Sequence, residues 1–89
     1  MITKATILSQ RDAIIRLASS YGAHDVRLFG SLARGDSTAT SDVDLVVRFD
    51  PDRSLLDHGG LLMDLRDLLD CKVDVISEGG TRKGDIHLY

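Results

Sequence analysis

The sequence predicts an α/β or α+β fold in which helices flank a small mixed β-sheet. Three short runs rich in Val, Ile, Leu and Phe are typical of strands, and two longer segments show helical periodicity. The expected order is helix, strand, loop, strand, helix, strand. The strands joined through a helix should be parallel, whereas the loop between the first two strands permits either direction. A mixed sheet follows from this order.

The first helix is expected over residues 4–21, where apolar residues recur at spacings of three, four and seven. Gly22 follows in the position of a helix C-cap. The first strand covers residues 25–29, which combine β-branched and aromatic side chains, and it stops at Gly30. The apolar stripe of the helix consists of Ile7, Ile14, Ala18 and Tyr21, widened by Leu8, Ile15 and Leu17.

Small and polar residues dominate the segment 30–41. This composition favours one turn of helix after Ser31 and then a loop. The second strand is expected over residues 43–49, which are strongly apolar at their centre, and Asp50-Pro51 closes it.

The second helix is expected over residues 54–69, with Gly59-Gly60 inside it. Because glycine disfavours helix, we expect the regular helix to begin after this pair. The third strand covers residues 72–76, and the tail, residues 78–89, is expected to be a loop. The leucine stripe of the helix consists of Leu62, Leu65 and Leu69 beside Leu55, Leu61 and Leu68, and the tail residues expected to dock back are Ile86, Leu88 and Tyr89.

Composition excludes several classes of function. The 89 residues suffice for one small domain, residues 1–89, with 43% hydrophobic and 28% charged residues. A net charge of −3 supplies no basic footprint, so duplex DNA is not an expected partner. No apolar run approaches the roughly 20 residues of a membrane span, so no membrane partner is expected. Cys71 is the only cysteine, which favours a reducing cytoplasm.

Three carboxylates occupy apolar strand contexts. Asp42 and Asp44 flank Val43 at the start of the second strand and share a face, because side chains alternate along a strand. Asp74 lies within the third strand and joins them if the two strands are neighbours. Carboxylates packed together repel, and divalent cations with a preference for oxygen ligands, such as Mg²⁺ or Mn²⁺, relieve this repulsion. Two such ions clamp the oxygens of a phosphoryl transfer.

A turn suited to phosphate binding precedes these carboxylates. Gly30 and Ser31 follow a strand and open a turn of helix, so backbone N–H groups and the Ser31 hydroxyl can hold a phosphate. Taken alone, Asp-x-Asp is a weak motif. The simpler interpretation is then a loop or cap role for Asp42 and an edge-strand charge for Asp74. The turn and all three carboxylates together favour the chemical interpretation.

The combined motif resembles that of minimal nucleotidyltransferase (MNT) domains in the DNA polymerase beta-like superfamily. It comprises the stretches 28–35 (LFGSLARG) and 41–47 (SDVDLVV), in which ten residues separate Gly-Ser from Asp-x-Asp, as in the family. The third carboxylate, Asp74, also stands where the family places it. The resemblance covers most of residues 4–77 and implies a nucleotidyltransferase fold. Family members commonly continue with a further helix, so this sequence resembles a C-terminally short member.

The resemblance also implies roles for individual residues. Gly30 and Ser31 would bind the nucleotide phosphates. Asp42, Asp44 and Asp74 would hold two Mg²⁺ ions, with Mn²⁺ as an alternative, and Asp74 would help deprotonate the attacking hydroxyl. A nucleoside monophosphate would pass from a nucleoside triphosphate to this hydroxyl.

Members of the family that this sequence resembles are typically encoded beside a small helical HEPN-domain protein, which is a toxin. The resemblance therefore implies an antitoxin that transfers AMP from ATP to a toxin tyrosine, in a cytoplasmic hetero-oligomer. Arg34 would contact a phosphate or the partner protein, and a solvated loop arginine is an equally simple interpretation. Two alternatives remain open: a non-catalytic module that neutralises its partner by binding, and a nucleotidyltransferase acting on a small molecule or RNA.

Overall fold

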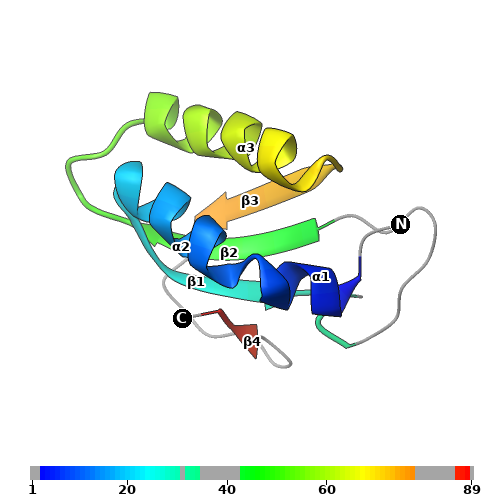
Figure 1. Ribbon diagram of the computed structural model, residues 1–89. Coiled ribbons are helices and arrows are strands. Elements are labelled where there is room, and N and C mark those ends of the chain that lie inside the picture. Colours follow the sequence, from blue (N-terminus) through cyan, green and yellow to red (C-terminus); the bar gives the residue numbers. More distant parts are fainter. Residues whose placement is uncertain (1–2, 31, 35–42, 78–85, 89) are drawn as a thin grey trace.

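The computed structural model describes residues 3–30, 32–34, 43–77 and 86–88, and it confirms the expected mixed α/β class (Figure 1). A sheet is covered on one face by helices α2 and α3. The elements are α1 (Lys4–Ser9), α2 (Arg11–Ser20), β1 (Ala23–Phe29), β2 (Val43–Phe49), α3 (Leu55–Leu69), β3 (Val73–Ser77) and β4 (Ile86–His87).

The sheet has the strand order β3-β2-β1-β4. Strands β2 and β3 are parallel neighbours, as expected for strands joined through a helix. Strand β1 pairs antiparallel with β2, which resolves the direction that the connecting loop left open. Strand β4 pairs antiparallel with the other edge of β1. The sheet is therefore mixed, with β3 at one edge.

The single helix expected at the N-terminus is two helices, so this prediction was wrong. Gln10 leaves helical geometry, with φ −100° and ψ 8°. The Ser9 hydroxyl donates to the Thr6 carbonyl at 2.7 Å and competes there with the Gln10 N–H. The change of direction lets Ile7 of α1 and Ile14 of α2 both become fully buried.

Helix α3 runs without interruption through Gly59-Gly60, contrary to the expected later start. Its first turn is stabilised by a capping box, in which the Ser54 N–H donates to Asp57 Oδ2 at 3.0 Å. Gly60 also has a packing role, because a Cβ there would lie 2.6 Å from Cε1 of Tyr21. The cap explains why the helix begins before the glycines, and the close approach explains the glycine at position 60.

The leucine stripe of α3 was only partly predicted. Leu61, Leu65 and Leu69 are buried as expected. Leu55 and Leu68 lie at the margins of the buried arc, and 86% and 37% of their respective surfaces are exposed. The N-terminal turn of α3 therefore presents apolar surface to solvent.

The alternation of side chains along β2 separates the core from the opposite face of the sheet. Val43, Leu45 and Val47 pack in the hydrophobic core with the helices. Asp44 lies between two of these residues, so its side chain projects from the face that the helices do not cover. In β3, Asp74 lies between the core residues Val73 and Val75, so its side chain projects from the same uncovered face.

The tail docks onto the sheet, as expected for its apolar residues, but it does so partly as a strand rather than a loop. Ile86–His87 forms β4, and the Leu88 N–H donates to the Val26 carbonyl at 3.1 Å. Leu88 is fully buried, whereas Tyr89 lies outside the described residues. Among the helices that the structure describes, each is too short or too polar to cross a membrane.

Candidate active site

Asp44 and Asp74 lie directly opposite each other on neighbouring strands. The parallel register of β2 and β3 pairs these two residues. Backbones of paired strands are about 4.8 Å apart, and paired residues point to the same face of the sheet. Both side chains are half-buried. The prediction that Asp74 joins the carboxylates of the second strand is therefore confirmed for Asp44.

The turn after β1 lies against the Asp44 carboxylate. Phe29 pairs with Asp44, and Gly30 follows with φ +81°. A Cβ on Gly30 would lie 2.8 Å from Oδ2 of Asp44, closer than real Cβ contacts allow. The sequence predicted a tight turn at Gly30. The structure adds that the absent side chain makes room for a carboxylate.

The short turn after Gly30 is held by a hydrogen bond and by burial. The Arg34 N–H donates to the Gly30 carbonyl at 3.3 Å, which fits the expected helical turn. Leu32 is fully buried and Ala33 is 6% exposed, so both side chains of the turn pack in the hydrophobic core. Arg34 is exposed at its end. Ser31 and Asp42, two of the expected site residues, lie outside the described residues.

The donor chemistry of the carboxylate pair fits a divalent metal ion. Two like charges held in register repel, and a hard cation with oxygen ligands removes this repulsion. Among the described residues there is no group of three or more His, Cys, Asp or Glu side chains placed to hold a metal ion. The described part of the site is thus the Asp44–Asp74 pair beside Gly30.

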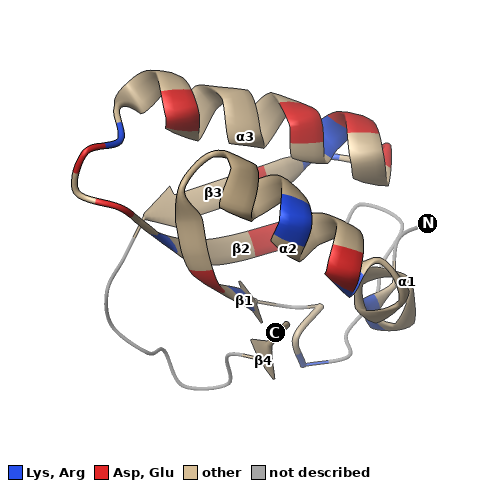
Figure 2. Ribbon diagram, turned by 60° about the vertical axis from the view of Figure 1, so that its left-hand side comes forward, with Lys and Arg blue, Asp and Glu red and all other residues tan. Residues whose placement is uncertain are grey.

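Basic residues occupy the same face of the sheet, farther along β1 and β2. Arg27 is fully buried, and its Nε lies 4.0 Å from Oδ2 of Asp25. Arg48 Nη2 lies 3.9 Å from the same oxygen. Acidic residues, in contrast, recur along α3 on the other side of the sheet (Figure 2). The face that carries Asp44 therefore also carries two arginines, and both of them lie beside the Asp25 carboxylate.

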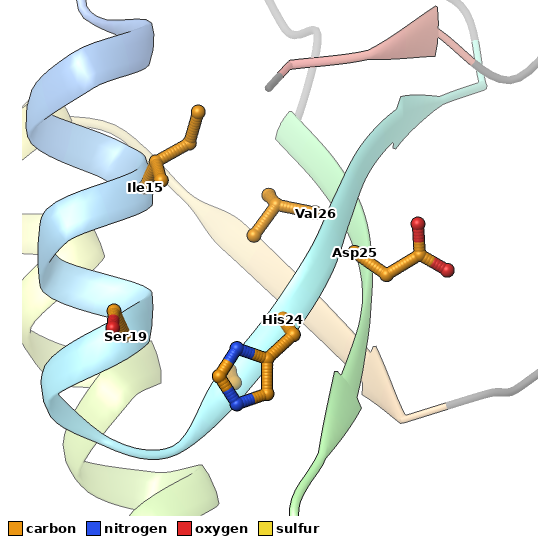
Figure 3. Close-up of a pocket in the computed structure, with 6 residues that line it drawn as sticks. Ile15, Ser19, His24, Asp25 and Val26 are labelled. Carbon is orange, nitrogen blue, oxygen red and sulfur yellow. The ribbon is translucent and has the colours of Figure 1, made fainter.

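A pocket of about 220 Å³ lies apart from the carboxylates, between α2 and the first half of β1 (Figure 3). Ile15 and Ser19 line it from α2, and Val26 from β1, whereas the Asp25 side chain points away from α2. It adjoins the contact between His24 and Asp50, in which Nε2 and Oδ1 are 2.9 Å apart. Because Gly30 follows the other end of β1, this pocket is separate from the candidate site.

Sequence reasoning missed two side chains that contact β3. His58 Nε2 lies 2.8 Å from the Val75 carbonyl, and Arg66 Nε donates to the Val73 carbonyl at 3.3 Å. Both come from α3, and their helical spacing alone gives no reason to select them. What identifies them is the position of β3 at the edge of the described sheet, where its outward carbonyls accept hydrogen bonds from side chains of α3.

Known proteins resemble this chain in both sequence and fold. The family model described as nucleotidyltransferase domain matches residues 11–87. A candidate protein adenylyltransferase of Methanocaldococcus jannaschii is 38% identical over 64 residues, which are 72% of this chain and 69% of that protein. The protein adenylyltransferase MntA of Thermococcus cleftensis is 34% identical over 68 residues, covering 76% and 69% respectively. The matched region spans about two thirds of these relatives.

Two solved structures show the same arrangement. A candidate minimal nucleotidyltransferase, 41% identical, superposes with a TM-score of 0.79 and covers 92% of this chain and 84% of that chain. A toxin–antitoxin complex with AMP-PNP has a TM-score of 0.74 and covers 89% and 72% respectively. At 21% identity, this second likeness concerns the fold alone. The chain belongs to the nucleotidyltransferase domain family.

Proposed function

We propose that this protein transfers AMP from ATP to a hydroxyl group of a partner protein. The observation that carries the proposal is the Asp44–Asp74 pair in register beside the Gly30 turn, within a nucleotidyltransferase domain. The names of the relatives, which are protein adenylyltransferases, support a protein as the acceptor. The hydroxyl oxygen bonds to the α-phosphorus, the bond to the β-phosphate oxygen breaks, and pyrophosphate leaves.

The site residues have two kinds of role in this proposal, namely binding of phosphates and metal ions and transfer of a proton. Gly30 and Ser31 hold the phosphates through backbone N–H groups and the Ser31 hydroxyl. Asp42, Asp44 and Asp74 hold two Mg²⁺ ions, or Mn²⁺ in their place. When bound, these ions supply charge neutralisation for the triphosphate. Asp74 accepts the proton of the attacking hydroxyl.

Arg34 is the remaining residue for which we propose a role. It is exposed at the end of the turn that begins at Gly30, a position from which it can meet either a phosphate or the partner protein.

The acceptor that we propose is a tyrosine of a HEPN-domain toxin. The choice of a toxin as acceptor is motivated by a structural neighbour of the same fold, a toxin–antitoxin complex solved with AMP-PNP. The protein then acts in the cytoplasm as part of a hetero-oligomer, and modification of the tyrosine neutralises the toxin.

Label transfer tests this function. The protein is incubated with α-labelled ATP, Mg²⁺ and the proposed HEPN-domain partner, and label on the partner is quantified. We expect the Asp42→Asn/Asp44→Asn variant to lose at least about 100-fold of the transfer rate, because charge stabilisation is the main catalytic term. Asp67→Asn, at an exposed position of α3, serves as the matched control and should retain it. Equal transfer by wild type and the double variant would refute the catalytic assignment.

A second function, neutralisation by binding alone, is favoured by one observation. Leu55 and Leu56 are each 86% exposed in the first turn of α3, and neighbouring exposed apolar side chains are typical of protein interfaces. If binding suffices, the folded Asp42→Asn/Asp44→Asn variant protects cells from the partner as well as wild type does. Loss of protection by this variant supports catalysis.

A further inference from the structure

Within the described residues, the outer edge of β3 is covered by side chains of α3 and pairs with no further strand. In the described part of the sheet, β3 is the terminal strand. The Val75 carbonyl accepts a hydrogen bond from His58 Nε2 at 2.8 Å, and the Val73 carbonyl accepts one from Arg66 Nε at 3.3 Å. Because a carbonyl oxygen only accepts, Nε2 of His58 carries the proton.

These two carbonyls flank Asp74. Backbone groups of successive strand residues point to alternate sides, so the N–H and C=O of Asp74 face β2 while those of its neighbours face outward. The inner side of β3 is fixed by the ladder to β2, as in the bond from the Val43 N–H to the Lys72 carbonyl at 3.0 Å. Asp74 therefore lies at the centre of a segment that is hydrogen-bonded on both sides.

The two donors are themselves held in place. The His58 ring stacks on Phe49, with ring centroids 5.4 Å apart. Arg66 is half-buried one turn before the end of α3. Helix α3 packs alongside β3, so the donors reach the strand from opposite ends of the helix (Figure 1).

We propose that His58 and Arg66 are positioning residues that fix Asp74 opposite Asp44. A terminal strand with open carbonyls frays more readily than a central one. Fraying of β3 changes the separation of the two carboxylates, and small misplacements of reacting groups are costly in enzymes. The two hydrogen bonds prevent this movement. The inference rests on the proposed function for its kinetic consequence, but the geometry of the pair is measurable without turnover.

Matched variants separate the donor from the bulk of each side chain. His58→Phe keeps a ring against Phe49 but removes the donor, and His58→Gln restores an N–H near the position of Nε2. Arg66→Met keeps the length of the stem without a donor, and Arg66→Gln places an N–H at the position of Nε. Met63→Gln, on the exposed face of α3, controls for substitution in this helix.

Three readouts are compared: hydrogen exchange of the Asp74 amide, the Kd for Mn²⁺, and kcat and KM for labelled ATP. In His58→Phe and Arg66→Met we expect faster exchange, and a Kd for Mn²⁺ raised and a kcat lowered by about tenfold each, as for other residues that orient metal ligands. KM for ATP stays unchanged. Both Gln variants should remain within about threefold of wild type, since the donor is restored.

The proposal is overturned if folded His58→Phe and Arg66→Met match wild type, or if the Gln variants lose as much as these two. Should the Phe or Met variants not fold, the Gln variants decide, with retained Mn²⁺ affinity supporting the proposal and its loss refuting it. The wild-type protein could lack transferase activity while amide exchange and Mn²⁺ affinity still change in the variants without a donor and recover in the Gln variants. This result contradicts only the proposed function. Transfer that is insensitive to the donors contradicts only the positioning role.

Discussion

Replacing Gly30 by alanine should impair nucleotidyl transfer beyond its effect on stability. Gly30 has φ +81°, and an L-residue in this region costs about 1–2 kcal/mol. In a domain of this size, such a loss lowers Tm by about 4–16 °C. The new Cβ would also lie 2.8 Å from Asp44 Oδ2, whereas ordinary contact begins at 3.4 Å. The carboxylate must therefore move by about 0.6 Å, and a 1 Å misplacement costs about 100-fold in rate, so we expect at least a tenfold loss.

Gly22→Ala is the matched control for this experiment. Gly22 has φ +75°, so alanine strains the backbone similarly, but its Cβ would meet the flexible side chain of Arg53 instead of a carboxylate. Thermal unfolding followed by circular dichroism gives the stability of each variant. Label transfer per folded molecule, measured well below both Tm values, gives activity. Gly22→Ala should lose stability and keep its transfer rate. If Gly30→Ala also keeps the wild-type rate, the role of the close approach to Asp44 is refuted.

Three further predictions concern stability. Gly59→Ala should stabilise the protein by about 1 kcal/mol, because a Cβ there meets nothing within 4 Å and the position is helical; a lower Tm would contradict this. The Tyr21 hydroxyl donates to Asp64 Oδ2 at 2.5 Å, and this bond raises the pKa of Tyr21 above its ordinary value of 10.0. The stability advantage of wild type over Tyr21→Phe should thus be complete below pH 10 and decline as pH rises further, and an advantage that grows above pH 10 would refute it. In urea unfolding, Leu61→Ala should cost about 2–5 kcal/mol, whereas Leu56→Ala, 86% exposed, should cost less than about 0.5 kcal/mol, and equal losses would contradict the packing of α3.

The parts of the fold that local chemistry determines were predictable from the sequence. The bounds of β2 follow from its apolar run, and the carboxylates within two apolar runs indicated that Asp44 and Asp74 would share a face if the strands were neighbours, which the structure shows them to be. The Ser54–Asp57 capping box was also present in the sequence. Its effect outweighs the helix cost of Gly59-Gly60, which is why the expected later start of α3 was wrong.

Other features depend on which elements become neighbours in space. The contact of His58 with Val75 arises only because β3 is a terminal strand and α3 packs beside it. Likewise, Gly30 indicated a tight turn, but its contact partner, Asp44, depends on the antiparallel register of β1 and β2. The break at Gln10 had no strong local signal, because glutamine is a good helix former.

The position of the label in ATP tests the central claim most directly. Parallel reactions contain α-labelled or γ-labelled ATP, Mg²⁺, the partner protein, and either wild type or the Asp44→Asn variant. The account predicts that wild type transfers the α label and not the γ label, because pyrophosphate leaves, and that Asp44→Asn transfers neither. Transfer of the γ label, or undiminished transfer of the α label by Asp44→Asn, would contradict it.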